Sequence, residues 1–177
     1  MLKVKVAGSG NKMAEYALIG ITPKEENGFN NEFNVLNYYD YIHRVLNELE
    51  KRSKGIDLME GYVPDTLYIL WLNEVPIGLF SFRHYLNDFL KEGPGHIGFS
   101  IHKDYRNQGY GTKGLKLLLE TIKNQIVEDE IYMSCYKDNP ASLKVQLNNG
   151  AYIHHEDDKY YYTRIKIQNI GENYESK

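Results

Sequence analysis

The spacing of apolar residues predicts strands and helices along most of the chain. Alternation from Leu2 to Val6 indicates a short strand. Apolar residues between Tyr38 and Leu49 recur at helical spacing, with Asn37 as a suitable N-cap and Gly55 as a stop signal. The polar stretch from Thr22 to Asn34, between these two segments, is expected to be a loop.

The remaining two thirds of the chain show a regular alternation of patterns. Two strand-like runs at 66–72 and 75–83 are separated by Asn73-Glu74, which predicts a hairpin. A hairpin followed by strand–helix–strand units predicts a mixed α/β sheet. The further predicted elements are a strand at 96–102, a helix at 112–126, a strand at 130–136, a helix at 141–149, and strands at 151–155 and 159–167.

Length and charge exclude several classes of protein. A chain of 177 residues fits a single domain with one core. No apolar run is long enough to span a bilayer, and the N-terminus lacks the apolar stretch of a signal peptide, so we expect a cytoplasmic protein without a membrane partner. The formal net charge of −3 argues against nucleic acid as the main partner.

Two features that could bind metal or react are expected to do neither. Cys135 is the single cysteine and lies in an apolar strand-like run, so it is expected to be a buried hydrophobic residue. The segment from His154 to Asp158 is rich in metal-ligand types. Adjacent strand residues point to opposite faces, which favours a solvated hairpin tip over a metal site.

The segment from Ile97 to Thr112 predicts a phosphate-binding loop. A strand runs into a short polar loop, then two glycines, then a helix. Glycines allow backbone amides to approach a ligand without interference from a Cβ atom. The free N–H groups and the positive end of the following helix favour phosphate. The sequence therefore predicts a phosphate-bearing cofactor.

The glycines alone permit a dinucleotide-dependent oxidoreductase. Gly109, Gly111 and Gly114 spell the G-x-G-x-x-G fingerprint, and the acidic Asp138 follows further along. In that fingerprint the first glycine closes the strand directly, whereas residues 103–108 intervene here. The preceding antiparallel hairpin also does not belong to a doubly wound fold, so this is the less favoured alternative.

The longer pattern resembles the GNAT superfamily of acyl-CoA-dependent N-acyltransferases. Arg106 to Gly111 reads R-x-x-G-x-G and looks like the pyrophosphate loop of that family. Asn139 to Ser142, with Gly150 downstream, resembles the N-x-x-S…G segment that follows the next strand. Asn139 is also a good N-cap before Pro140. The resemblance covers roughly residues 67–167.

Upstream segments resemble one branch of the family more closely. The sequences V-P-D-T from Val63 to Thr66, Arg83-His84, Leu86-Asn87 and G-H-I-G from Gly95 to Gly98 are similar to a bacterial group of predicted acetyltransferases. The members of that group have no agreed substrate.

The resemblance implies a fold and a cofactor. The fold is an α/β, GNAT-like, mixed and largely antiparallel sheet with a splayed central strand, flanked by helices. Residues 1–60 form a helical substrate-side region, 61–168 the cofactor-binding core and 169–177 a tail. The co-substrate is acetyl-CoA, inserted beside the strand that ends at Ile101. The implied cofactor-binding residues are Phe99, Ser100, Ile101, Arg106, Asn107, Gln108, Gly109, Tyr110, Gly111, Thr112, Asn139 and Ser142.

The implied activity is N-acetyl transfer to a primary amine of a small molecule or peptide, by direct attack; a homodimer is compatible with the sequence. The usual tyrosine acid is replaced by Gln146. Either another residue serves as the acid, with Tyr136 as the candidate, or solvent does, or positioning alone supplies the rate. The alternative is a non-catalytic CoA-binding module. His96 is the expected general base. Arg83 and His84 are expected to contact the acceptor; Arg83 either binds a carboxylate on it or pairs at the surface.

Overall fold

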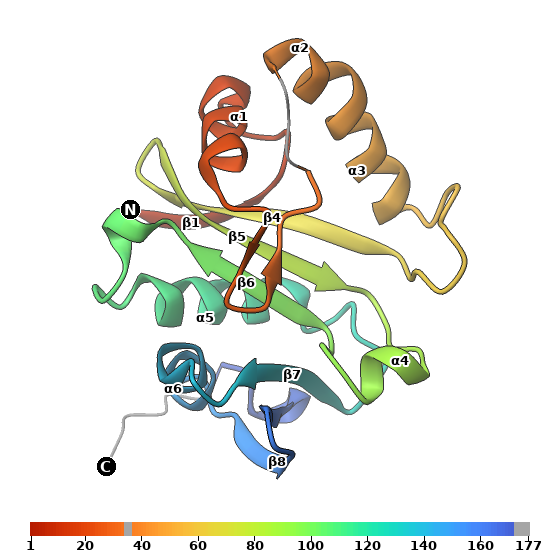
Figure 1. The fold of residues 1–177 in the computed structure, drawn as a ribbon, viewed down its shortest axis with the longest axis vertical. Coiled ribbons are helices and arrows are strands. Elements are labelled where there is room, and N and C mark those ends of the chain that lie inside the picture. Colours follow the sequence, from red (N-terminus) through yellow and green to blue (C-terminus); the bar gives the residue numbers. More distant parts are fainter. Residues whose placement is uncertain (34–36, 172–177) are drawn as a thin grey trace.

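The computed structural model describes residues 1–33 and 37–171, so Asn34 of the predicted loop and residues 172–177 of the predicted tail lie outside it. Two sheets form the framework (Figure 1). The main sheet is antiparallel, in the order β1-β4-β5-β6, and the second has the order β7-β9-β8. The strands are β1 (Leu2–Val6), β4 (Asp65–Leu72), β5 (Val75–Arg83), β6 (Ile97–Ile101), β7 (Glu130–Tyr136), β8 (Tyr152–Glu156) and β9 (Tyr160–Lys166).

Alternation along the strands gives the main sheet an apolar surface on each face. On one face, Ile69 and Trp71 pack against α1 (Lys12–Ile21) and α3 (Leu46–Ser53). On the opposite face, Leu70 and Phe80 pack against α5 (Tyr110–Ile122). Figure 1 shows these helices above and below the sheet. Two cores therefore hold the sheet from both sides.

The predicted helix of the N-terminal region is present and contains an unexpected segment. It starts as α2 (Tyr38–Asp40), continues as a π-helical turn (Tyr41–Val45) and ends as α3. The Asn37 side chain accepts from the Asp40 N–H at 2.9 Å, which confirms the predicted N-cap. Residues 1–60 also supply β1 to the main sheet, where it pairs with β4.

The predicted loop at 22–34 contains a hairpin, so that part of the prediction is wrong. Strands β2 (Glu25–Glu26) and β3 (Phe29–Asn30) pair across Asn27 and Gly28, which have φ of 52° and 85°. These values are typical of the Asn-Gly hairpin turn. The strands have only two residues each, so they carry too little alternation to stand out in the sequence.

The remaining elements follow the predicted order with shifted ends. The helix expected at 112–126 is α5, which begins two residues earlier and ends at Ile122. The helix expected at 141–149 is α6 (Pro140–Leu147). The short helix α4 (Asp88–Lys91) and the 3-10 turns at Lys103–Tyr105 and Ile167–Asn169 were not expected. Such single turns are too short for a periodic pattern.

Among the described residues, no helix combines the length and apolarity that a membrane crossing requires. The same residues hold no group of three or more His, Cys, Asp or Glu side chains suited to a metal ion.

The contact between α5 and the main sheet generates a stability prediction. A Cβ added at Gly114 would lie 2.7 Å from Leu70 Cδ2 and 2.8 Å from Phe80 Cζ, inside a closed core. We expect Gly114→Ala to lower the free energy of unfolding by about 1–3 kcal/mol through overpacking. Gly20 of α1 has nothing within 4 Å of the same position, so Gly20→Ala should raise it by up to about 1 kcal/mol. Urea unfolding of both variants tests this, and equal effects would contradict the packing described.

Candidate active site

The two sheets meet at one point and separate beyond it. The His96 N–H donates to the Tyr132 carbonyl at 2.7 Å, and Gly95 bridges Met133. A Cβ at Gly95 would lie 2.2 Å from the Tyr132 oxygen, so only glycine permits this approach. Figure 1 shows β6 and β7 running in the same direction. We call this contact between His96 and Tyr132 the joint. Beyond the joint, no ladder of backbone hydrogen bonds connects β6 to β7 within the described part of the chain. This is the predicted splay.

A cavity of about 530 Å³ lies at the open end of the splay. We call it the loop-side cavity. Of the residues predicted to bind the cofactor, Gln108 alone is not part of its lining; its amide donates to the Asp104 carbonyl at 3.0 Å. The predicted residues that line the cavity are Phe99, Ser100, Ile101, Arg106, Asn107, Gly109, Tyr110, Gly111, Thr112, Asn139 and Ser142.

The start of α5 presents backbone N–H groups to the loop-side cavity. The N-cap residue Gly109 has φ 77° and makes no side-chain cap, and Asn107 has φ 59°. The first intrahelical bond from this end runs from the Lys113 N–H to the Gly109 carbonyl. An uncapped helix start with left-handed residues before it forms a positive, concave site for an anion.

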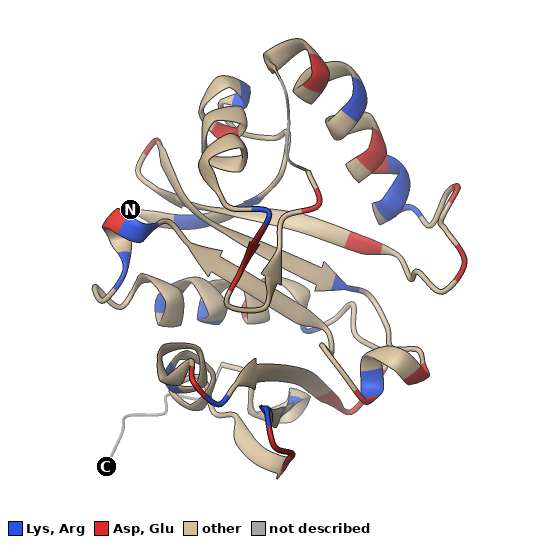
Figure 2. Ribbon diagram, in the orientation of Figure 1, with Lys and Arg blue, Asp and Glu red and all other residues tan. Residues whose placement is uncertain are grey.

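Arg106 ties this loop to two neighbouring elements. Its Nε donates to the Ile101 carbonyl at 2.8 Å, which anchors the end of β6. Its Nη2 donates to Glu26 of β2 at 2.5 Å. Figure 2 shows the acidic strand β2, in red, lying across β6. The arginine of the motif therefore holds the loop, β6 and the hairpin together.

The β2–β3 hairpin reaches across the splay from the main sheet. Phe29 lies over Gly98 of β6, and Gly28 lies against the ring of Tyr136 at the end of β7. Asn27 lines the loop-side cavity. The hairpin thus covers the gap between the two sheets, a role that the sequence did not predict, although its Asn-Gly pair is a recognised turn signal.

A second cavity of about 310 Å³, the central cavity, lies under this hairpin. It shares Phe99 and Ser142 with the loop-side cavity. Tyr136 lines it, and its ring stacks on Tyr160 with centroids 4.6 Å apart. A hydrogen bond with Tyr136, together with partial burial, raises the pKa of Tyr160 to about 12. Tyr136, the last residue of β7, is therefore a phenol in the lining of the central cavity.

Gln146 is a buried structural residue. Its Oε1 accepts from Thr163 Oγ1 at 2.6 Å, and its Nε2 donates to Ser142 Oγ at 3.2 Å. Its side chain links α6 to the second sheet and is not part of the lining of the cavities. An amide cannot donate a proton as an acid, and this one has its partners already.

His96 does not occupy the position of a general base. It is fully buried, and its Nδ1 accepts from the Tyr132 N–H at 3.0 Å. Because a backbone N–H only donates, the ring proton is on Nε2, which donates to Glu128 at 3.0 Å. Burial lowers the pKa of His96, an effect that outweighs the neighbouring Glu128. With both nitrogens occupied, we do not retain His96 as the base; strand position alone suggested it, without showing its partners.

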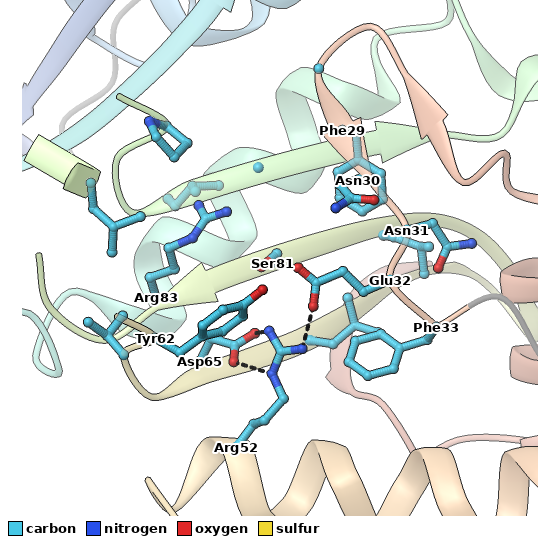
Figure 3. Close-up of a pocket in the computed structure, with 18 of the residues that line it drawn as sticks. Phe29, Asn30, Asn31, Glu32, Phe33, Arg52, Tyr62, Asp65, Ser81 and Arg83 are labelled. Atoms are coloured by element: carbon cyan, nitrogen blue, oxygen red, sulfur yellow. Dashed lines mark hydrogen bonds and ion pairs between the residues drawn. The ribbon is translucent and has the colours of Figure 1, made fainter. Parts of the chain in front are cut away.

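A third cavity of about 540 Å³, the sheet-face cavity, continues from the central one over the main sheet. The two share Phe29, Gly98 and Ser134. Figure 3 shows the charged residues inside it. Arg52 of α3 binds both oxygens of Asp65, at 2.7 and 2.9 Å, and Glu32 at 2.6 Å. The sequence did not predict this network, because its members lie far apart in the chain.

The two residues predicted to contact the acceptor lie on opposite sides of β5. Arg83 lines the sheet-face cavity, where its Nη1 donates to the Gly95 carbonyl at 3.1 Å. His84 is hydrogen-bonded to Thr66 at 2.8 Å and lines none of the three cavities. Neighbouring residues at a strand end point to opposite faces. The prediction for His84 is therefore not supported.

Three further predictions concern side chains with structural roles. Asn139 Oδ1 accepts from the Ser142 N–H at 3.1 Å, which confirms the capping role. Cys135 is buried, as expected, and burial raises the pKa of its thiol to about 11. His154 and His155 lie on the exposed strand β8, and the ring of His155 stacks on Tyr162.

Comparison with known proteins agrees with this architecture. A family model described as the acetyltransferase (GNAT) domain matches residues 30–151. The chain therefore belongs to the GNAT acetyltransferase family, and the dinucleotide alternative is wrong. The comparison with curated protein sequences gave no match.

Solved structures of the same fold include acetyltransferases with different acceptors. Ribosomal-protein-S5-alanine acetyltransferase from Vibrio fischeri has a TM-score of 0.65 and 14% identity, over 96% of this chain and 94% of that chain. The N-acetyltransferase PseH of Campylobacter jejuni, in complex with acetyl coenzyme A, has a TM-score of 0.59 and 17% identity, over 94% and 99%. Spermidine N-acetyltransferase from Vibrio cholerae, in complex with CoA and spermine, has a TM-score of 0.58 and 12% identity, over 94% and 96%. At these identities the likeness shows the fold alone.

The buried imidazole of His96 generates a prediction about pH. Its pKa is lowered in the folded chain, whereas an unfolded histidine titrates near about 6.5. The unfolded chain then binds more protons, so the free energy of unfolding should fall as pH drops below about 6.5. We expect His96→Gln to lose part of this dependence; the part due to His84, whose pKa burial also lowers, should remain. Urea unfolding between pH 7.5 and 5 measures it, and an unchanged slope would show that His96 titrates normally.

Proposed function

We propose that this protein transfers an acetyl group from acetyl-CoA to a primary amine by direct attack. The observation that carries the proposal is the splay between β6 and β7, with an uncapped helix start at its open end. The membership of the family and the acetyl coenzyme A complex of PseH support the choice of co-substrate. The three joined cavities provide a place for the co-substrate, the reaction and the acceptor.

The cofactor side of the site depends on backbone groups. The N–H groups at the start of α5 bind the pyrophosphate, and the Gly109 position has nothing within 4 Å of an added Cβ, which leaves room for it. The free edge of β6, from Phe99 to Ile101, pairs with the pantetheine arm as a further strand would. The thioester then lies in the central cavity, near Gly98 and Ser134.

The reaction is nucleophilic addition followed by elimination. The lone pair of the neutral amine forms a C–N bond with the thioester carbonyl, and the carbonyl electrons move to oxygen. A backbone N–H of β6 stabilises this oxyanion. The oxyanion electrons re-form the carbonyl as the C–S bond breaks, and the leaving thiolate takes a proton from Tyr136. The nitrogen loses its extra proton to water, and water returns one proton to the Tyr136 phenolate.

Tyr136 is the acid that this arrangement favours. It lines the central cavity, and Tyr160 holds its ring by stacking and a hydrogen bond. Gln146 occupies the usual position of the acid, and its amide is committed to Ser142 and Thr163. The phenol of Tyr136 lines the central cavity from β7, the other wall of the splay, and can serve as the proton donor there.

A non-catalytic CoA-binding module is the second candidate, because Gln146 replaces the usual acid. The two candidates differ in thiol release. Acetyl-CoA incubated with a panel of amines should yield free CoA thiol only if the protein is an enzyme, whereas calorimetric binding of CoA is expected in both cases. Binding without release for every amine would favour the module.

The pyrophosphate site can be tested by one substitution at Gly109. Gly109→Glu places a side chain and a negative charge among the N–H groups, so CoA affinity should fall on the order of 100-fold or more. Gly171→Glu is the matched control, because Gly171 also has positive φ and open space around it. Isothermal titration with CoA measures both; equal affinities would mean that the pyrophosphate binds elsewhere.

The role of Tyr136 is tested by removing its hydroxyl group. Tyr136→Phe should lower kcat by about 100-fold, with the KM for acetyl-CoA nearly unchanged, because the leaving thiolate loses its proton donor. Tyr152→Phe removes a phenol on β8 that donates to Glu130 and should have no effect. Steady-state thiol release provides the comparison, and full turnover by the Tyr136 variant would assign the proton to another donor.

A further inference from the structure

The sheet-face cavity contains one guanidinium group, that of Arg83, with few hydrogen-bond partners. Arg83 is half-buried there, and its Nη1 donates to the Gly95 carbonyl. A guanidinium has five N–H donors. Within the described residues, no carboxylate lies at ion-pair distance from Arg83. Burial lowers the pKa of Arg83, and the charges of Asp65 and Glu32 oppose this effect only in part.

The other guanidinium of the cavity is fully paired. Arg52 holds Asp65 through two hydrogen bonds and Glu32 through a third. Burial alone would lower the pKa of Arg52, but these two acids raise it. Asp65 and Glu32 are thus both paired with Arg52, so neither carboxylate is free to bind the ammonium groups of a polycationic acceptor.

We propose that the acceptor is a small amine that carries a carboxylate, and that Arg83 binds this carboxylate in the sheet-face cavity. The inference rests on the proposed acetyl transfer and narrows its substrate class. A planar guanidinium suits a carboxylate because two parallel N–H bonds match its two oxygens. The amine of the same molecule then points toward the central cavity.

The strand register gives the length of such an acceptor. Ser81 pairs with Gly98 of β6, where the central cavity begins, and Arg83 lies two residues further along β5. Two residues of a strand span about 7 Å. Ile97, which pairs with Phe82 between these two positions, adds an apolar side chain to the cavity wall. This fits an amine and a carboxylate separated by a short aliphatic chain.

Matched pairs of acceptors test the proposal kinetically. γ-Aminobutyrate and butylamine differ by the carboxylate, as do β-alanine and propylamine. At equal concentrations of neutral amine, we expect the acid of each pair to have a kcat/KM about 10- to 100-fold higher, the usual range for a hydrogen-bonded charge pair. Spermidine should be a poor acceptor, and equal or better use of spermidine or of the plain amines would overturn the proposal.

Variants of Arg83 assign the effect to its side chain. Arg83→Gln should remove the advantage of the acids, so that γ-aminobutyrate and butylamine have nearly equal kcat/KM when both are measured with this variant. Arg83→Lys keeps the charge without the planar fork and should retain part of the advantage. Arg44→Gln makes the same change of charge at an exposed arginine outside the cavity and should retain all of it. Preserved discrimination in folded Arg83→Gln, verified by thermal unfolding, would overturn the proposal.

A binding measurement separates this proposal from the proposed reaction. N-acetyl-γ-aminobutyrate and N-butylacetamide are the corresponding products, and each can be titrated into the CoA-bound protein by calorimetry. Tighter binding of the acid, lost in Arg83→Gln, supports the carboxylate site even if no acceptor is turned over, a result that would reject the transfer alone. Equal binding of the two compounds would overturn the site, whatever the turnover.

Discussion

The hydrogen bonds at His96 are the constraint on which the site depends. Its backbone N–H donates to the Tyr132 carbonyl, and its imidazole Nδ1 accepts from the Tyr132 N–H. These two hydrogen bonds close one end of the gap between β6 and β7. Glu128 fixes the tautomer in which Nδ1 accepts. Because Gly95 allows its backbone to approach that of Tyr132 closely, the two sheets separate only beyond this contact. A buried, neutral histidine thus sets where the cavity begins, and it has no free nitrogen for chemistry.

The N-terminal region supplies part of the walls of the central and sheet-face cavities. The β2–β3 hairpin crosses the splay, with Phe29 over Gly98 and Gly28 against Tyr136. The bond from Arg106 to Glu26 ties the hairpin to the glycine loop. Since the hairpin touches both sheets, the shape of the central cavity depends on residues from both ends of the chain.

The charges of the sheet-face cavity divide into a satisfied group and an unsatisfied one. Arg52 pairs with both Asp65 and Glu32, and so joins α3 to β4 and to the segment that follows β3. Breaking one of these ion pairs would leave a charge without a partner in the cavity, which is energetically costly. The three side chains therefore form a rigid part of the cavity wall. Arg83 lies outside the network and has a carbonyl as its hydrogen-bond partner. A rigid wall beside one open guanidinium favours recognition of a single anionic group.

The sequence by itself determined the order of the strands and of the longer helices α5 and α6 from β4 onward, because their periodic patterns are long. It also located the glycine loop before α5, since the spacing of Arg106, Gly109 and Gly111 is local. Short elements such as the hairpin carry no periodicity, so only the tertiary structure located them. The same holds for the partners of His96 and for the faces of Arg83 and His84. Hydrogen bonds and ion pairs between residues far apart in the chain decided these roles, and such contacts leave no mark on local sequence.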